Sequence, residues 1–184
     1  MNDFIIRNHW LENARRVPSE NHDERPAGSK LTLIVVHCIS LPPGTFGGKD
    51  IDRLFQNQLD PQAHPDYGLI SRLRVSAHAL VRRTGGITQY VPFAMRAWHA
   101  GESSYDGQPR CNDFSIGIEL EGTDDSPFAD VQYQQLAQMI LSLIDQYPTL
   151  SLDRVAGHSD IAPGRKTDPG IQFDWDRLFE LIAG

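Results

Sequence analysis

The sequence predicts an α/β protein of the α+β kind, with a mixed central sheet flanked by helices in a single domain. Leu31–His37 is a short apolar, β-branched run typical of a buried strand, and Phe114–Glu121 alternates between apolar and polar residues. Asp130–Tyr147 has an apolar stripe at helical spacing. Strands and helices do not alternate regularly along the chain, which favours a mixed sheet over a doubly wound fold.

The first third of the chain supplies the centre of the predicted sheet. Pro18–Ser29 is polar and contains proline and glycine, which indicates a surface loop. Leu31–His37 is apolar on both faces, so we expect it to be a central strand. Asp50–Leu59 places apolar residues at i, i+3, i+4 and i+8, which predicts a helix over that span.

The middle of the chain adds a hairpin and a strand of its own. Thr84-Gly85-Gly86 predicts the turn between Arg74–Arg82 and Ile87–Pro92. Phe114–Glu121 puts isoleucine and leucine on one face and polar residues on the other, so we expect a half-buried strand.

The last third is predicted to add two helices and one strand. Asp130–Tyr147 is followed by a proline and is the clearest helix of the sequence. Arg154–Gly157 is a short strand candidate. Asp174–Ala183 predicts a C-terminal helix capped by Asp174. The 184 residues suit one domain, residues 1–184.

Composition and charge exclude several classes of function. The formal net charge is −7, and an acidic surface repels a phosphate backbone, so we expect no nucleic acid partner. No window reaches the ~20 apolar residues that a membrane span needs. Met1–Trp10 carries charged residues and no apolar signal-peptide core. We therefore expect a cytoplasmic protein without a membrane partner, in which Cys38 and Cys111 are free thiols.

Histidines and carboxylates indicate a candidate metal site. A catalytic zinc site keeps three protein ligands, often histidine and carboxylate, and one open position. His37 ends the predicted central strand, a rigid place from which to present a ligand, although a histidine at a strand end could instead simply bond to the backbone. The loop Gly157–Gly170 crowds His158, Asp160 and Asp168 among proline and glycine residues. Its spacing does not choose between the two carboxylates, and a solvated loop is the simpler alternative.

Two glutamates on one strand are candidates for acid–base chemistry. Glu119 and Glu121 are two residues apart, so both face a cleft or both face solvent. Gly117 lies on the same face, and we interpret this glycine as leaving space for a substrate to approach the sheet.

Several long strings of the sequence together resemble the pattern of one enzyme family. They are Val36-His37, Ile39–Gly44, Val75–His78, Arg96–Gly101, Arg110–Gly122 and Gly157–Gly170. The family that these strings resemble is the cytoplasmic 1,6-anhydro-N-acetylmuramyl-L-alanine amidases, a branch of the zinc amidases related to peptidoglycan recognition proteins. The resemblance runs from about Trp10 to the C-terminus.

The resemblance implies a fold, a cofactor and a reaction. It implies a mixed sheet with Zn2+ in a groove on one side, held by His37, His158 and Asp168. It makes Glu119 the base and Lys166 the group that stabilises the transition state. The implied reaction is hydrolysis of the amide bond between N-acetylmuramic acid and L-alanine in soluble anhydro-muropeptides during cell-wall recycling.

The same resemblance suggests how the substrate is bound. Arg74 and Arg110 are expected to bind the peptide carboxylates, and Trp98 to stack against the sugar. His78 is expected in the core and His99 near the substrate.

One position departs from the family pattern. Cys38 follows the first ligand where the family usually has an asparagine, and a thiol is a poor hydrogen-bonding replacement. The substitution could alter substrate affinity or peptide preference. Strand alternation should turn Cys38 away from the direction of His37, so we do not expect a fourth metal ligand.

Two other functions fit parts of the sequence. Some members of the wider superfamily bind peptidoglycan fragments without catalysis and lack a zinc ligand. This sequence instead has all three expected ligands and both expected catalytic residues, which are His37, His158, Asp168, Glu119 and Lys166. An amidase acting on polymeric cell wall is the other alternative. We expect a monomeric enzyme whose loss lets muropeptides accumulate and derepresses β-lactamase where the regulator exists.

Overall fold

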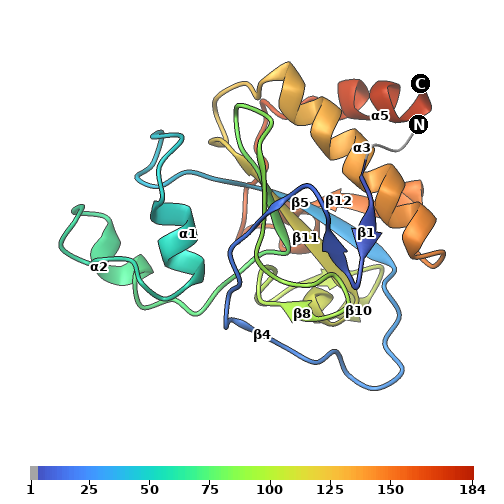
Figure 1. Cartoon of the computed structure of the whole chain (residues 1–184), viewed down its shortest axis with the longest axis horizontal. Coiled ribbons are helices and arrows are strands. Elements are labelled where there is room, and N and C mark those ends of the chain that lie inside the picture. The colour runs from blue at the N-terminus through green and yellow to red at the C-terminus, as the bar shows by residue number, and fades with distance from the viewer. Residues whose placement is uncertain (1–3) are drawn as a thin grey trace.

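The computed structural model describes residues 4–184 and is built around a six-stranded mixed sheet (Figure 1). The two longest strands, β5 and β11, are parallel neighbours in its centre. The hairpin partners β6 and β7 form its only antiparallel pair among the described residues. In spatial order the strands are β12 (Val155–Gly157), β5 (Leu33–Ile39), β11 (Ser115–Glu121), β6 (Ala79–Val81), β7 (Ile87–Gln89) and β3 (Arg15–Arg16).

Helices and three small two-stranded sheets surround this sheet. The small sheets are β1 (Ile6–Arg7) with β2 (Trp10–Leu11), β4 (His22–Asp23) with β8 (Arg96–Ala97), and β9 (Ser104–Tyr105) with β10 (Gln108–Pro109). The α-helices are α1 (Asp50–Phe55), α2 (Tyr67–Ile70), α3 (Asp130–Gln146), α4 (His158–Ile161) and α5 (Trp175–Ala183). Two 3₁₀ turns, η1 (Cys111–Asp113) and η2 (Leu152–Arg154), precede β11 and β12.

Helices α3 and α5 cover one face of the sheet, where Figure 1 shows them side by side. Ile34 and Val36 of β5, with Ile118 and Leu120 of β11, are fully buried in this layer. The apolar stripe of α3 packs on them, and burial of each such side chain stabilises the fold by roughly 1.5–3 kcal/mol.

The opposite face of the sheet has a thinner and less regular cover. Leu33 and Val35 of β5 contact a cluster from η1 and α4, and Leu80 of β6 contacts one from α1 and α2. Polar side chains interrupt the apolar packing between these two clusters. These polar side chains lie at the carboxyl ends of the parallel strands, which is where ligands bind in open α/β sheets.

Most of the predicted elements are confirmed. The central strand, the hairpin, the strand before Glu121, the helix from Asp130 and the short strand before His158 are all present within a few residues of the predicted bounds. The C-terminal helix begins after Asp174, whose carboxylate accepts a hydrogen bond from the backbone N–H of Arg177 at 2.9 Å.

Three predictions about elements were wrong in detail. The helix expected over Asp50–Leu59 ends at Phe55, because Asn57 adopts a left-handed conformation with φ 60°. All seven residues of β11 are buried, so it is not a half-buried strand. Pro18–Ser29 is not simply a surface loop, since it contains β4 and the buried side chains of Ser19 and Asn21.

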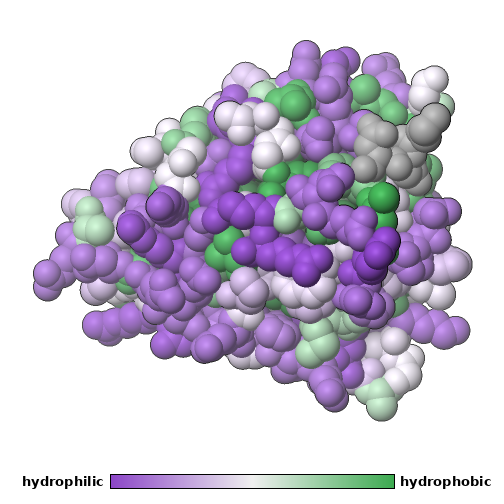
Figure 2. Space-filling view, in the orientation of Figure 1, coloured by the Kyte–Doolittle hydropathy of each residue, from purple (hydrophilic) through white to green (hydrophobic). Residues whose placement is uncertain are grey.

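One face of the molecule is mainly polar. Figure 2 shows hydrophilic residues over most of the face drawn, with smaller hydrophobic areas between them. Within residues 4–184, no helix combines the length and apolarity required to cross a membrane.

Candidate functional site

Three adjacent strands place three of the predicted site residues beside one another. His37 lies on β5 directly opposite Glu119 on β11, its partner in the parallel register. His158 follows β12, which pairs with β5 on the other side. The residues His37, Glu119 and His158 are 1%, 8% and 3% exposed, so the sheet places all three in one buried region.

Asp168 completes a compact group of possible metal ligands. Its Oδ2 lies 3.0 Å from His37 Nδ1 and 3.1 Å from His158 Nδ1, and these two nitrogens are 3.0 Å apart. The loop that carries Asp168 is tied to α4 by a hydrogen bond from Ser159 N–H to the Asp168 carbonyl oxygen. Among the described residues, His37, His158 and Asp168 form the one group arranged to hold a metal ion.

The chemistry of this group fits a divalent cation. Three acceptor atoms about 3 Å apart repel one another unless a proton or a cation lies between them. His158 Nε2 lies 3.1 Å from the carbonyl oxygen of Ala100, which can only accept, so the proton of the neutral ring is on Nε2 and Nδ1 presents a lone pair. Atoms at these separations can reach one ion at the ~2.0–2.2 Å typical of zinc with imidazole and carboxylate ligands.

The charges in the group suit metal binding at neutral pH. Burial lowers the pKa of His37 to about 4, so its imidazole is neutral at pH 7. Burial acts to raise the pKa of Asp168, but its contacts with His158 and His37 outweigh burial and keep this pKa below the usual range. The site therefore presents a neutral histidine and an ionised carboxylate, the protonation states that a metal requires.

Glu119 has an unusual environment for a carboxylate. Its Oε2 is buried and has no hydrogen-bond partner within the part of the chain described. Burial first, and then the negative charge of Asp168, raise the pKa of Glu119 well above its ordinary value. A buried carboxyl group with a raised pKa beside a candidate metal site is typical of a proton-transferring group.

A pocket of about 210 Å³ contains the candidate ligands and Glu119. Lys166 lines it as well, two residues before Asp168 on an exposed loop, so this loop delivers both side chains to the pocket. Apolar side chains form much of the remaining wall. They are Ile39, Leu54, Phe55, Leu73 and Val75.

The predicted substrate-binding residues lie in different places. Trp98 lines the pocket, and its indole N–H donates to Asp23 Oδ1 at 3.2 Å. Arg74 is exposed and Arg110 forms an ion pair with Asp113 at 3.0 Å. Neither arginine lines the pocket of the candidate ligands, and their predicted contacts with substrate carboxylates stay predictions.

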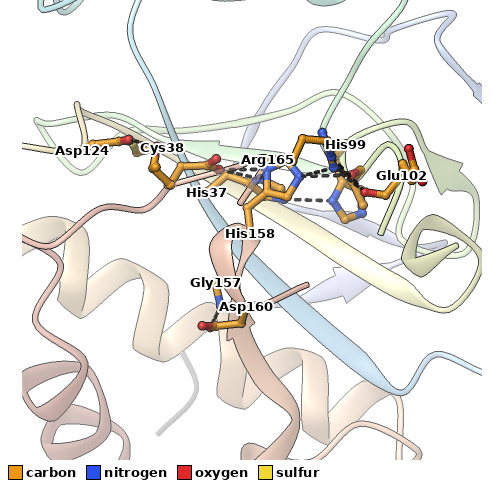
Figure 3. Close-up of polar contacts among 12 residues, drawn as sticks. His37, Cys38, His99, Glu102, Asp124, Gly157, His158, Asp160 and Arg165 are labelled. Atoms are coloured by element: carbon orange, nitrogen blue, oxygen red, sulfur yellow. Dashed lines mark hydrogen bonds and ion pairs between the residues drawn. The ribbon is translucent and has the colours of Figure 1, made fainter. Parts of the chain in front are cut away.

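The structure distinguishes Asp160 from Asp168. Asp160 Oδ2 accepts a hydrogen bond from the N–H of Gly157 at 2.7 Å and closes the first turn of α4. Figure 3 shows Asp160 directed toward Gly157 and away from the rings of His37 and His158. Asp160 is thus engaged in local structure, and Asp168 is the carboxylate that reaches both histidines.

Cys38 packs on the side of the sheet covered by α3. Its thiol donates to Asp124 Oδ1 at 3.2 Å, and Figure 3 shows this pair apart from the histidine rings. Burial raises the pKa of Cys38 well above its ordinary range, so the thiol is protonated at neutral pH. Cys38 nevertheless lines the pocket of the candidate ligands, so the expected effect of this substitution on substrate binding stays a prediction.

The interpretation of Gly117 was wrong. A Cβ atom at Gly117 would lie 2.4 Å from the ring of His99, so the space above this glycine is taken by a side chain of the protein. His99 lines the pocket, as expected for a residue near the substrate, but its ring also contacts His37 Nε2 at 2.9 Å. Ser115, which bonds to His99, was not predicted as a site residue, although alternation places it on the face of Glu119.

Known proteins share both the sequence and the fold. The model of the N-acetylmuramoyl-L-alanine amidase family matches residues 27–171. The 1,6-anhydro-N-acetylmuramyl-L-alanine amidase AmpD of Escherichia coli K12 is 59% identical over 180 residues, which are 98% of each chain. The AmpD of Haemophilus influenzae is 50% identical over 172 residues, 94% of each chain.

Solved structures agree with these sequence relations. The crystal structure of a selenomethionine AmpD derivative superposes with a TM-score of 0.94 at 57% identity, covering 97% of this chain and 99% of that chain. The amidase AmiD from E. coli was solved with the substrate anhydro-N-acetylmuramic acid-L-Ala-D-γ-Glu-L-Lys. It superposes with a TM-score of 0.59 at 30% identity and covers 86% of this chain and 60% of that one.

Proposed function

The chain belongs to the N-acetylmuramoyl-L-alanine amidase family, and we infer from this that it hydrolyses the amide bond between N-acetylmuramic acid and L-alanine. We assign it the soluble 1,6-anhydro-muropeptides of cell-wall recycling as substrates, because relatives that match nearly the whole chain are amidases of that name. The observation that carries the proposal is the convergence of His37, His158 and Asp168 beside the buried, unpartnered carboxyl of Glu119.

The proposed cofactor is Zn2+, held by His37, His158 and Asp168. Two imidazoles and one carboxylate, with room for a further ligand, are a donor set typical of catalytic zinc. A zinc ion in this place supplies a Lewis acid that polarises the amide carbonyl and makes water a better nucleophile at neutral pH.

Glu119 is the proposed general base. It takes a proton from the attacking water and passes it to the leaving nitrogen of L-alanine. Its raised pKa suits both steps, since a carboxyl group that titrates closer to neutral pH can accept a proton and release it again. The absence of another hydrogen-bond partner for Oε2 within residues 4–184 leaves that oxygen available for water.

Lys166 is proposed to stabilise the negative charge that develops on the carbonyl oxygen. It lines the same pocket as Glu119 and the candidate ligands. Cations and donors placed where charge develops make a large contribution to catalysis of acyl transfer. The position of Lys166 on the Asp168 loop couples the placement of this charge to the placement of a metal ligand.

Trp98, Arg74 and Arg110 are the proposed substrate-binding residues. Trp98 forms one wall of the pocket and can stack on the sugar ring. Arg74 and Arg110 are exposed cations outside the pocket, from which they can reach carboxylates along the peptide.

The proposed cellular context follows from the substrate. We place one zinc amidase domain over residues 1–184, acting as a monomer in the cytoplasm, where recycled wall fragments are processed. Loss of the activity would let anhydro-muropeptides accumulate and induce β-lactamase in bacteria whose regulator responds to them. The net charge of −7 and the absence of a spanning helix in the described residues make nucleic acid or a membrane poor candidates for partners.

The test is hydrolysis of one defined anhydro-muropeptide, followed by mass spectrometry. The enzyme should release the intact peptide, lose activity on removal of metal by a chelator, and regain it with zinc. Binding without release of peptide would favour a non-catalytic recognition module. Faster release of peptide from intact sacculi than from the soluble fragment would favour an amidase of polymeric wall.

A further inference from the structure

The ring of His99 lies against Gly117 of β11 and contacts the candidate ligand His37. Its Nδ1 is 2.9 Å from His37 Nε2, and its Nε2 is 3.1 Å from Ser115 Oγ. The Ser115 hydroxyl in turn donates to the backbone carbonyl oxygen of Cys111 at 2.6 Å. These contacts form one unbroken chain of hydrogen bonds from the backbone to His37 (the contact between His99 and His37 is drawn in Figure 3).

The donors and acceptors in this series of hydrogen bonds determine which nitrogen of each histidine carries a proton. A carbonyl oxygen only accepts, so the single hydrogen of the Ser115 hydroxyl is committed to Cys111. Ser115 Oγ must then accept from His99 Nε2–H, which leaves the lone pair of a neutral His99 on Nδ1. That lone pair accepts from His37 Nε2–H, and the Nδ1 lone pair of His37 faces His158 and Asp168.

The segment that carries His99 also forms a hydrogen bond with the second candidate histidine ligand, His158. The carbonyl oxygen of Ala100, the residue after His99, accepts from His158 Nε2 at 3.1 Å. Asn112 fixes this dipeptide, because its Oδ1 accepts from the N–H groups of both His99 and Ala100, at 3.1 and 2.8 Å. Arg165 also donates to the Ala100 carbonyl oxygen, at 2.6 Å.

The strand beneath His99 is shaped for its ring. Ser115, Gly117 and Glu119 alternate along the same face of β11. Ser115 bonds to His99, and any side chain at Gly117 would overlap its ring, since a Cβ there would lie 2.4 Å from it. One face of one strand therefore supplies the hydrogen-bond partner of His99, the space for its ring, and the neighbouring Glu119.

We propose that His99, held by Ser115 and Asn112, is a positioning residue that keeps His37 protonated on Nε2 and so presents its Nδ1 lone pair to zinc. This inference rests on the proposed function, because it requires the zinc site at His37, His158 and Asp168. Groups that orient a ligand histidine in this way typically change metal affinity by about 10–100-fold when they are lost.

The test compares zinc affinity among variants of the full chain, by competition with a chromophoric chelator. Ser115→Ala and His99→Leu remove an acceptor and should weaken zinc binding by roughly 10–100-fold. His99→Asn keeps an amide oxygen near the position of Nδ1 and should restore most of the affinity. Ser142→Ala is the matched control, a buried serine of α3 whose hydroxyl has no hydrogen-bond partner among residues 4–184.

A merely structural role for His99 predicts a different result. Both His99 variants would then lose affinity alike, in proportion to a fall in the Tm of the metal-free protein. Wild-type affinity in His99→Leu or Ser115→Ala, or equal losses in the two His99 variants, would overturn the proposal. Failure of the wild-type chain to bind zinc would instead remove the proposed function.

A spectroscopic measurement tests the same inference without any substitution. Long-range ¹H–¹⁵N spectra of the zinc-loaded wild-type protein should show His99 and His37 each carrying a proton on Nε2 and none on Nδ1. A proton on His99 Nδ1 would mean that the hydrogen bonds between Ser115, His99 and His37 run in the opposite direction. That result would contradict the proposed role of His99, even if His99→Leu did not fold.

Discussion

Glu119 and Glu121 project from the same face of β11, but their carboxylates differ in hydrogen bonding within residues 4–184. Glu121 Oε1 accepts from Arg82 at 3.0 Å and from Gly47 N–H at 2.7 Å, and its Oε2 accepts from Arg83 N–H at 3.1 Å. Glu119 Oε2 is buried without a hydrogen-bond partner among the described residues. The two carboxylates are therefore expected to serve different purposes, one in proton transfer and the other in stability.

Glu119→Gln should remove the proton-transfer group and leave the metal site intact. The amide has nearly the same size but cannot take a proton from water, so we expect kcat to fall by about 10²–10⁴-fold. Zinc content, measured by atomic absorption, should match that of the unaltered protein, because Glu119 is not one of the three candidate ligands. A variant with full zinc and undiminished kcat would show that another group is the base.

Glu121→Gln provides the contrast within the same strand. It replaces a charged acceptor of three hydrogen bonds by a neutral amide, and we expect the free energy of unfolding to fall by about 1.5–3 kcal/mol. The kcat of the folded fraction should change little. Urea unfolding and steady-state kinetics check the two parts, and a large drop in kcat with unchanged stability would exchange the roles of the two glutamates.

The raised pKa of Glu119 predicts a pH-dependent stability of the metal-free protein. Between the ordinary pKa of 4.5 and the higher folded-state value, the folded state binds a proton that the unfolded state has released. Stability therefore falls as pH rises through this window. Glu119→Gln removes the titration, so its free energy of unfolding should exceed that of the unaltered chain near pH 7, with the gap closing as pH approaches 4.5.

The comparison is made with a chelator present, by urea unfolding across that pH range. Titration of His37 and Asp168 affects both proteins. The difference between the unfolding free energies of the unaltered chain and Glu119→Gln therefore reports the titration of Glu119. A gap that is constant with pH, or one of opposite sign, would contradict the raised pKa.

Local patterns in the sequence predicted the helices and strands well, but they predicted the contacts between these elements less well. The run from Leu31 and the apolar stripe after Asp130 depend on neighbours along the chain, and both elements are present. The burial of β11 on both faces could not be seen, because its polar face is covered by His99 from a distant segment. The same limit made Gly117 look like space for a substrate.

The choice between two carboxylates as the metal ligand also depended on contacts that local sequence patterns do not reveal. Spacing within Gly157–Gly170 left Asp160 and Asp168 as equal candidates. Only the resemblance to the amidases favoured Asp168, which in the structure lies 3.0 and 3.1 Å from the two histidines. Asp160 forms a local cap, a short-range role that its place at the start of α4 could have indicated.

Asp168→Ala and Asp160→Asn should separate metal binding from local structure. Loss of the Asp168 carboxylate removes one of three candidate ligands, and we expect the purified protein to lose most of its zinc. Asp160→Asn should retain zinc, because the amide oxygen can still accept from Gly157 N–H. Metal analysis decides between them, and full zinc in Asp168→Ala with loss in Asp160→Asn would reverse the assignment.

Lys166→Ala should lower turnover without loss of metal. The lysine lines the pocket beside Glu119 but is not among the candidate ligands, so its ammonium group is free to act on the developing negative charge. Removal of one such stabilising group costs about 10²–10³-fold in kcat. Lys30→Ala, a change at an exposed lysine that does not line the pocket, is the control and should have no effect. Because transition-state stabilisation acts mainly on kcat, a rise in KM alone would assign Lys166 to substrate binding instead.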